Sequence, residues 1–195
     1  MMPVFSFLLF VIISSFTPGP NNIMAMAFAN KYGLKKTVSF CLGVGVGFFA
    51  ITLLCSVFNI VLTNVMPKIE FSLTLLGVGY MLYLAYKILT SKEGDDRIAK
   101  EHKNFFVIAI LLQFVNPKGI LFGITVVATF ILPYYYSYYS FLLFSVFLGI
   151  VGVISTFSWS LFGSVFQSLL SQYRQPFNIV MAGLLVYSAF SILVN

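Results

Sequence analysis

The stretch Phe-Thr-Pro-Gly-Pro-Asn-Asn at residues 16–22 interrupts an apolar segment that covers Val4–Ala29. A second stretch, Gln-Phe-Val-Asn-Pro-Lys-Gly at residues 113–119, interrupts the apolar segment Phe105–Leu132 in the same way. A proline inside a helix removes one backbone hydrogen bond and pushes away the carbonyl group four residues earlier. Both stretches therefore predict a long apolar helix that is broken near its middle.

The composition indicates an integral membrane protein. Of the 195 residues, 60% are hydrophobic and only 8% are charged, whereas soluble domains are roughly 45–50% apolar and about 25% charged. This balance excludes a soluble enzyme, a disordered chain and a nucleic-acid-binding domain. The net charge of +6 does not argue for a nucleic-acid partner, because the basic residues lie mostly between the apolar segments.

The apolar segments are long enough to be membrane-spanning helices, since a helix needs about 20 apolar residues to cross the hydrocarbon. A barrel would instead show alternating segments of ~10 residues. We predict an all-α fold with six transmembrane helices: Val4–Ala29, Val38–Leu62, Phe71–Leu89, Phe105–Leu132, Phe141–Phe166 and Phe177–Val194. The polar segments between them are Asn30–Thr37, Thr63–Glu70, Thr90–Asn104, Pro133–Ser140 and Gln167–Pro176.

The basic residues predict the orientation of these helices. Nine of the eleven lie in or beside Asn30–Thr37, Thr90–Asn104 and Gln167–Pro176, which share one face of a six-helix arrangement. The positive-inside rule assigns that face to the cytoplasm, so both termini are expected outside it. No Lys or Arg precedes the first apolar segment, which favours an uncleaved first helix over a signal peptide.

No residue pattern indicates an enzyme or a metal site. Cys41 and Cys55 lie on one predicted helix, about 21 Å apart along its axis. His102 is the only histidine and is expected to be a solvated loop residue. We therefore predict no catalytic residues, no metal and no cofactor.

The breaks combine helix starts with a buried cation. Thr17 before Pro18, and Asn116 before Pro117, are the predicted N-caps of new half-helices. A helix start exposes unpaired N–H groups with a partial positive charge, and Lys118 adds a full charge at membrane depth. No predicted helix holds an acidic residue within its span, so an exchangeable anion such as a substrate carboxylate is the expected partner. The alternative is a structural kink with a lysine that reaches toward the surface.

The two breaks occupy matching places in the chain. Pro20 and Pro117 are 97 positions apart, about half the length. We predict one membrane domain, residues 1–195, built as a 3+3 inverted repeat, a pattern typical of secondary transporters. Repeat one covers about residues 1–90, a cytoplasmic linker about 90–104, and repeat two about 105–195.

Stripes of small residues lie on the second and fifth predicted helices and allow neighbouring helices to approach closely. They also allow, without specifying, a homodimer. Their members are Ser39, Gly43 and Gly47 on the second helix and Ser145, Gly149, Gly152, Thr156 and Ser160 on the fifth.

Residues 17–22, the glycines that follow at 43–47, and residues 113–118 resemble the signatures of the lysine exporter (LysE/RhtB) superfamily of amino-acid exporters. Residues 130–133, 177–180 and 184–187 are most similar to its cysteine/O-acetylserine exporter branch. The resemblance covers the whole chain. It implies a multi-pass protein of the bacterial plasma (inner) membrane that exports amino acids from the cytoplasm, by antiport driven by the proton gradient.

The residues themselves favour a small neutral amino acid as substrate, because no buried carboxylate is present to receive a cationic side chain. Exporters of threonine, homoserine or basic amino acids, and a channel-like pore, remain alternatives. Lys118 and the half-helix starts would meet the substrate carboxylate, and carbonyls freed by the prolines, at Ser14, Phe16 and Gln113, would meet its ammonium. Either Lys118 or the substrate would carry a coupled proton. The predicted substrate-binding residues are Thr17, Pro18, Gly19, Pro20, Asn21, Asn22, Gln113, Asn116, Pro117 and Lys118.

Overall fold

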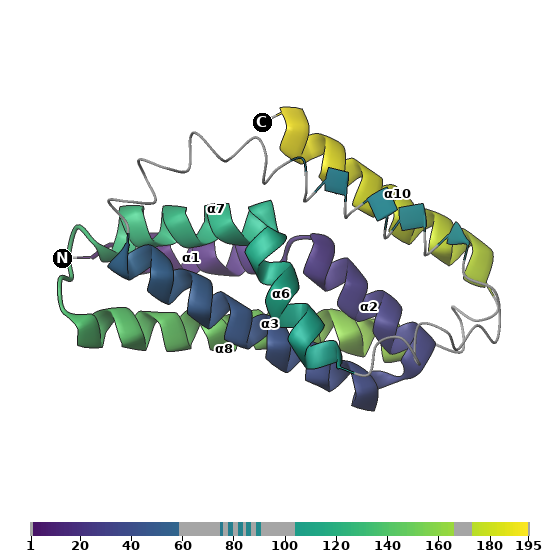
Figure 1. Ribbon diagram of the computed structural model, residues 1–195, viewed down its shortest axis with the longest axis horizontal. Helices are drawn as coiled ribbons and strands as arrows, with labels where there is room; N and C mark the ends of the chain where they lie inside the picture. The colour runs from purple at the N-terminus through teal and green to yellow at the C-terminus, as the bar shows by residue number, and fades with distance from the viewer. Residues whose placement is uncertain are drawn as a thin grey trace.

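The computed structural model describes residues 2–58, some positions between 75 and 90, and residues 104–165 and 173–194. Within these residues every regular element is a helix and there is no strand, which confirms the all-α class (Figure 1). The predicted helix Phe71–Leu89 and the polar segments Thr63–Glu70 and Thr90–Asn104 lie wholly or largely outside the described residues.

Two pairs of helices meet at the proline stretches. Helix α1 covers Val4–Phe16 and α2 covers Pro20–Tyr32, with a bend of 48° between them. Helix α6 covers Phe105–Val115 and α7 covers Pro117–Val126, and a π-helical turn, η1, continues α7 over Val127–Ile131. The bend within this second pair is 67°.

The remaining helices of the described part are continuous. Helix α3 covers Leu34–Val57 and α8 covers Tyr138–Val165, and each is long and apolar enough to cross a membrane. Counting each bent pair as one span brings the described candidates from two to four. Helix α10 covers Arg174–Val194 and overlaps the sixth predicted helix.

The predicted polar loop Asn30–Thr37 is wrong. Helix α2 continues to Tyr32 and α3 begins at Leu34, so a single residue, Gly33, separates the two helices. Gly33 has a φ of 83°, in the left-handed region that glycine enters without a steric penalty. The lysines of this segment therefore lie on helix ends, and polarity alone did not distinguish a charged helix end from a loop.

Helix α3 lies between α6 and α8, and glycines make this packing close (Figure 1). The Cα of Gly43 faces the backbone oxygen of Phe106 on α6, and Gly47 faces the side chain of Gln113. On the other side of α3, Gly45 packs against Gly149 of α8. The glycines of the predicted small-residue stripes thus lie at helix contacts.

Two hydrophobic clusters fill the interior at opposite ends of α3. The Phe40 cluster joins α2, α3, α6 and α10 through residues that include Ile23, Phe40, Val44, Ala109 and Leu185. The Phe7 cluster joins α1, α3, α7, η1 and α8 through residues that include Phe7, Ile51, Phe122, Ile131 and Leu148. Phe48 packs against both clusters.

Candidate functional site

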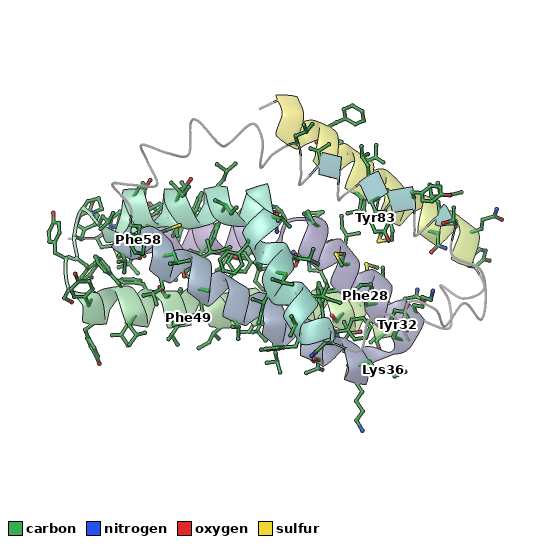
Figure 2. All side chains as sticks on the ribbon, viewed as in Figure 1. Phe28, Tyr32, Lys36, Phe49, Phe58 and Tyr83 are labelled. Atoms are coloured by element: carbon green, nitrogen blue, oxygen red, sulfur yellow. The ribbon has the colours of Figure 1, made fainter. Side chains whose placement is uncertain are left out.

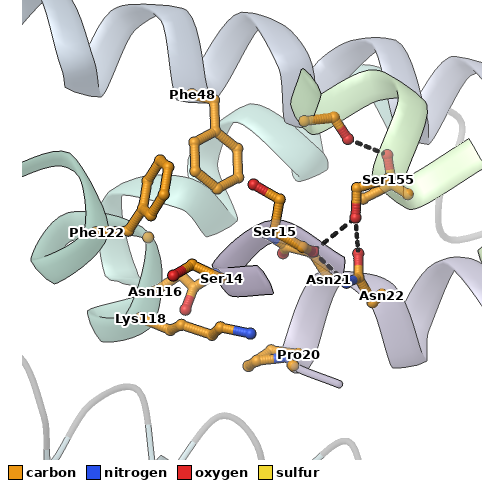
Figure 3. A pocket seen from close by; sticks show the side chains of 14 residues that line it. Ser14, Ser15, Pro20, Asn21, Asn22, Phe48, Asn116, Lys118, Phe122 and Ser155 are labelled. Carbon is orange, nitrogen blue, oxygen red and sulfur yellow. Dashed lines mark hydrogen bonds between the residues drawn. The ribbon is translucent and has the colours of Figure 1, made fainter. Parts of the chain in front are cut away.

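A small cavity lies where the two proline stretches meet (Figure 3). Its volume is about 30 Å³, and because one water needs roughly 10–15 Å³ by the same measure, it has room for about two waters. An amino acid therefore requires the cavity to widen. The cavity is lined by Ser14, Ser15, Gly19, Pro20, Asn21, Asn22, Phe48, Asn116, Lys118, Gly119, Phe122, Gly152, Ser155 and Thr156.

Lys118 reaches from the start of α7 to the stretch between α1 and α2. Its Nζ donates hydrogen bonds to Thr17 Oγ1 at 3.0 Å, Thr17 O at 3.2 Å and Pro18 O at 3.3 Å. The described residues contain no Asp or Glu, so neutral oxygens alone hold this ammonium. Gly19 lies against the lysine side chain, and a Cβ there would be 3.0 Å from Nζ. Because Gly19 has no side chain, the side chain of Lys118 can lie against its backbone.

Gln113 links both breaks to α3 and is fully buried. Its Oε1 accepts hydrogen bonds from Asn21 Nδ2 at 2.7 Å and from Asn116 Nδ2 at 3.3 Å. Its Nε2 donates to the carbonyl of Val44 at 3.4 Å. The amide of Gln113 therefore fixes the side chains at the starts of α2 and α7 relative to each other.

Helix α8 closes the cavity opposite the breaks and supplies residues that the sequence did not single out as ligands. Ser155 Oγ donates to Ser15 O at 2.6 Å and lies 3.4 Å from Asn22 Oδ1, and Trp159 Nε1 donates to Phe16 O at 3.2 Å. Asn22 Nδ2 adds bonds to Ser15 O at 2.8 Å and Thr17 O at 3.0 Å. Carbonyls at a helix break inside a membrane need such donors, and that requirement was the available signal for Ser155 and Trp159.

The predicted N-caps need correction. Helix α2 begins at Pro20, and Gly19, not Thr17, holds the N-cap position. The physical reason is that a residue before a proline is kept out of the helical region, which excludes both Thr17 and Gly19 from α2. Asn116 does occupy the N-cap position of α7, but neither helix has a side-chain cap hydrogen bond. Thr17 Oγ1 instead donates to Ser14 O at 3.1 Å.

The three carbonyls that lose a backbone partner to the prolines each accept a hydrogen bond from another group. Ser14 O accepts from Thr17 Oγ1, and Phe16 O accepts from Trp159. Gln113 O accepts the backbone N–H of Asn116 at 3.3 Å. Each of these carbonyls thus has one donor within the protein, and because a carbonyl oxygen can accept two hydrogen bonds, its predicted role toward a substrate ammonium stays a prediction.

The ten predicted site residues fall into three groups in the structure. Thr17 and Pro18 lie beside the cavity and hold Lys118, and Gln113 lies behind Asn21 and Asn116. Pro117 begins α7. The predicted residues that line the cavity are Gly19, Pro20, Asn21, Asn22, Asn116 and Lys118.

Comparison with known proteins identifies the family of the chain. The family model of the LysE type translocator matches residues 12–195. The chain is 36% identical over 187 residues to proteins named cysteine/O-acetylserine efflux protein from Salmonella typhi, Escherichia coli (strain K12) and Shigella flexneri serotype 5b. Each alignment covers 96% of this chain and 95% of the relative. No solved structure matches the chain. The chain is thus a multi-pass membrane protein that belongs to the LysE type translocator family.

Proposed function

We propose that this protein exports small neutral amino acids of the cysteine/O-acetylserine class across the inner membrane of a bacterium. The names of its relatives support export of this class. The cavity supports it independently, because its lining is made of hydroxyl, amide, glycine, proline and phenylalanine groups with Lys118 as the one charged member among the described residues.

Lys118 carries the proposal. A charge at membrane depth is costly unless it is paired, and in this structure its Nζ has three neutral oxygens and no carboxylate. Two helix starts, at Pro20 and Pro117, border the same cavity with their positive dipole ends. A substrate carboxylate satisfies this arrangement. A cationic side chain finds no acidic partner in the lining, which favours a neutral amino acid.

The packing of the helices supports alternating access between two inverted repeats. In a 3+3 repeat α1, α2 and α3 correspond to α6, α7 and α8, so the contact of α3 with α6 corresponds to that of α8 with α1. These equivalent contacts differ. Gly43 of α3 lies against the backbone of α6, and Gly163 of α8 lies against the backbone of α2, beside Met26. In the corresponding contacts side chains lie between the helices, with Phe7 against Phe144 between α1 and α8. Between α7 and α3, Phe122 lies against Phe48, and Gly123 faces the side chain of Ile51 rather than backbone.

Such unequal packing is what an inverted repeat requires, since exchanging the two arrangements opens one side and closes the other. The close backbone contacts lie toward the Gly33 turn, where Lys31, Lys35 and Lys36 gather. By the positive-inside rule this is the cytoplasmic end. The proposed state of the structure is therefore closed toward the cytoplasm, with both termini on the opposite side.

Proton antiport is part of the proposal. Lys118 is the one titratable group among the described residues that line the cavity. A proton bound at Nζ in one direction and released in the other would couple substrate movement to the gradient. An imposed pH gradient across vesicles should change the rate of uptake, and a rate independent of the gradient would remove proton coupling from the proposal.

The deciding experiment is uptake of labelled amino acids into inside-out vesicles that contain the wild type or Lys118→Met. Lys36→Met is the matched control, because Lys36 is exposed and points away from the helices (Figure 2). We expect saturable uptake of small neutral amino acids by the wild type and the control, and its loss in Lys118→Met. Uptake of basic amino acids would refute the neutral substrate. Non-saturable flux would favour a channel-like pore.

A further inference from the structure

The Oδ1 atom of Asn116 is a buried acceptor without a donor. The side chain is only 7% exposed and lines the cavity, and its Nδ2 donates to Gln113 Oε1. Its oxygen has no hydrogen-bond partner in the protein. Among the buried side-chain atoms of the described cavity lining it stands alone in this respect. Because buried polar groups are nearly always paired, such an oxygen needs an explanation.

The neighbouring amides fix the direction in which this oxygen points. Gln113 presents Oε1 to Asn116, because that oxygen also accepts from Asn21 at 2.7 Å while Gln113 Nε2 donates to Val44 O. Turning the Asn116 amide over would bring its oxygen against Gln113 Oε1 and lose the bond at 3.3 Å. The network therefore holds Oδ1 on the side away from Gln113.

Three backbone carbonyls around the cavity already have donors. Thr17 O and Pro18 O accept from Lys118, and Ser15 O accepts from Asn22 and Ser155. Asn116 Oδ1 differs from these carbonyls because no donor of the protein competes for it, so it can accept from a ligand for which the cavity has widened.

We propose that Asn116 Oδ1 accepts a hydrogen bond from the α-ammonium of the substrate. This inference rests on the proposed function and specifies it, since it assigns the second half of the zwitterion. One carbon separates the ammonium from the carboxylate in every α-amino acid, so the groups that bind them must be close together. Asn116 and Lys118 are two positions apart at the start of α7 and both line the cavity (Figure 3).

A neutral amide suits this position better than a carboxylate would. An Asp at 116 would attract Lys118 and remove the cation from the substrate carboxylate. The amide oxygen offers an acceptor while its nitrogen keeps the bond to Gln113. The pair of Lys118 and Asn116 thus distinguishes an α-amino acid from a plain carboxylic acid.

The test compares L-cysteine with 3-mercaptopropionate, which lacks only the ammonium, as inhibitors of labelled amino-acid uptake into inside-out vesicles under reducing conditions. The variants are wild type, Asn116→Leu and Ser145→Ala. Leu is close to Asn in size, and Gln113 Oε1 keeps its bond to Asn21 in that variant. Ser145 is the matched control, because its Oγ is also buried and unpartnered but does not line the cavity.

We expect the wild type and Ser145→Ala to prefer L-cysteine by about tenfold or more, the effect of one hydrogen bond to a charged group. In Asn116→Leu this preference should fall to near one, with inhibition by 3-mercaptopropionate changed by no more than about twofold. An equal loss for both compounds, or a retained preference, overturns the inference while leaving the proposed function standing. A wild type without any preference overturns it even if the variant does not fold. A wild type that takes up no amino acid overturns the proposed function itself.

Discussion

Replacing Gly19 by alanine should weaken substrate binding because the added methyl group displaces the side chain of Lys118 and disturbs nothing else. The added Cβ would lie 3.0 Å from Lys118 Nζ and 3.1 Å from its Cδ, closer than ordinary van der Waals contacts. The backbone of Gly19 is extended, with a φ of −164° and a ψ of 171°, a conformation that any residue adopts. Alanine is therefore not strained at this position, and the lysine side chain is what must move.

The size of the effect follows from the three bonds of Nζ. The bond to Pro18 O is the longest at 3.3 Å, so a shift of a few tenths of an ångström breaks it first. Interhelical hydrogen bonds in membranes average about 0.6 kcal/mol, and hydrogen bonds to charged groups start at about 1.5 kcal/mol. Loss of one such bond, with the ammonium displaced from the carboxylate position, should raise KM roughly 3- to 12-fold.

The assay is the initial rate of uptake into inside-out vesicles as a function of substrate concentration. Gly183→Ala is the control, because a Cβ at Gly183 of α10 meets nothing within 4 Å. We expect its KM to equal that of the wild type. An unchanged KM in Gly19→Ala would refute the reasoning. The reasoning would also fail if Gly19→Ala lowered the melting temperature equally in the wild type and in a Lys118→Met background. The methyl group would then act on something other than the lysine.

Three further predictions concern the surroundings of the cavity. Gln113→Leu leaves the amide nitrogens of Asn21 and Asn116 without their acceptor. It should lower the free energy of unfolding by about 1–3 kcal/mol, which corresponds to a drop of roughly 2–12 °C in melting temperature in detergent. An unchanged melting temperature would contradict the stabilising role of this hydrogen-bond network. Gly163→Ala places a Cβ against the backbone of α2 and should destabilise by about 1–3 kcal/mol, which the same melting assay would show as a drop. Trp159 is the single tryptophan and bonds to the end of α1, so its emission should shift on titration with a transported amino acid, and a constant spectrum would show that this end stays fixed.

The positions of the breaks could be predicted from the sequence because proline acts locally. Pro117 cannot donate a backbone hydrogen bond to the turn before it, which favours the first position of a new helix, and α7 does begin there. Lys118 was noticeable in the sequence for the same reason, because the cost of a cation in an apolar segment does not depend on which helices surround it, and the structure places Lys118 in the cavity lining. These features require only the chain near each residue, which is the information that a sequence carries directly.

The partners of these groups could not be predicted in the same way. Ser155 lies 140 positions from Ser15, yet its hydroxyl donates to that carbonyl. Only the packing of α8 on α1 brings the two together, and small residues on α8 indicate close packing without naming a neighbour. The start of α2 at Pro20 was missed for a different reason. Two prolines compete to begin the helix, and the restriction on Gly19 settles the choice.

The small volume of the cavity bears on how substrate leaves it. Room for about two waters means that one wall must separate from the others. On one side of the cavity α2 meets α8, and α6 meets α3. Both contacts are made through glycines, with backbone against backbone. On the other side rings fill the space, with Phe10 and Phe122 stacked at 5.7 Å and Phe122 edge-on to Phe48 at 5.6 Å. Rings open a path by rotating about side-chain bonds, whereas the glycine contacts open only if whole helices move. We therefore expect substrate to leave this state past Phe10 and Phe122, on the side that the proposed orientation assigns to the outside, which is the direction that the proposed export requires.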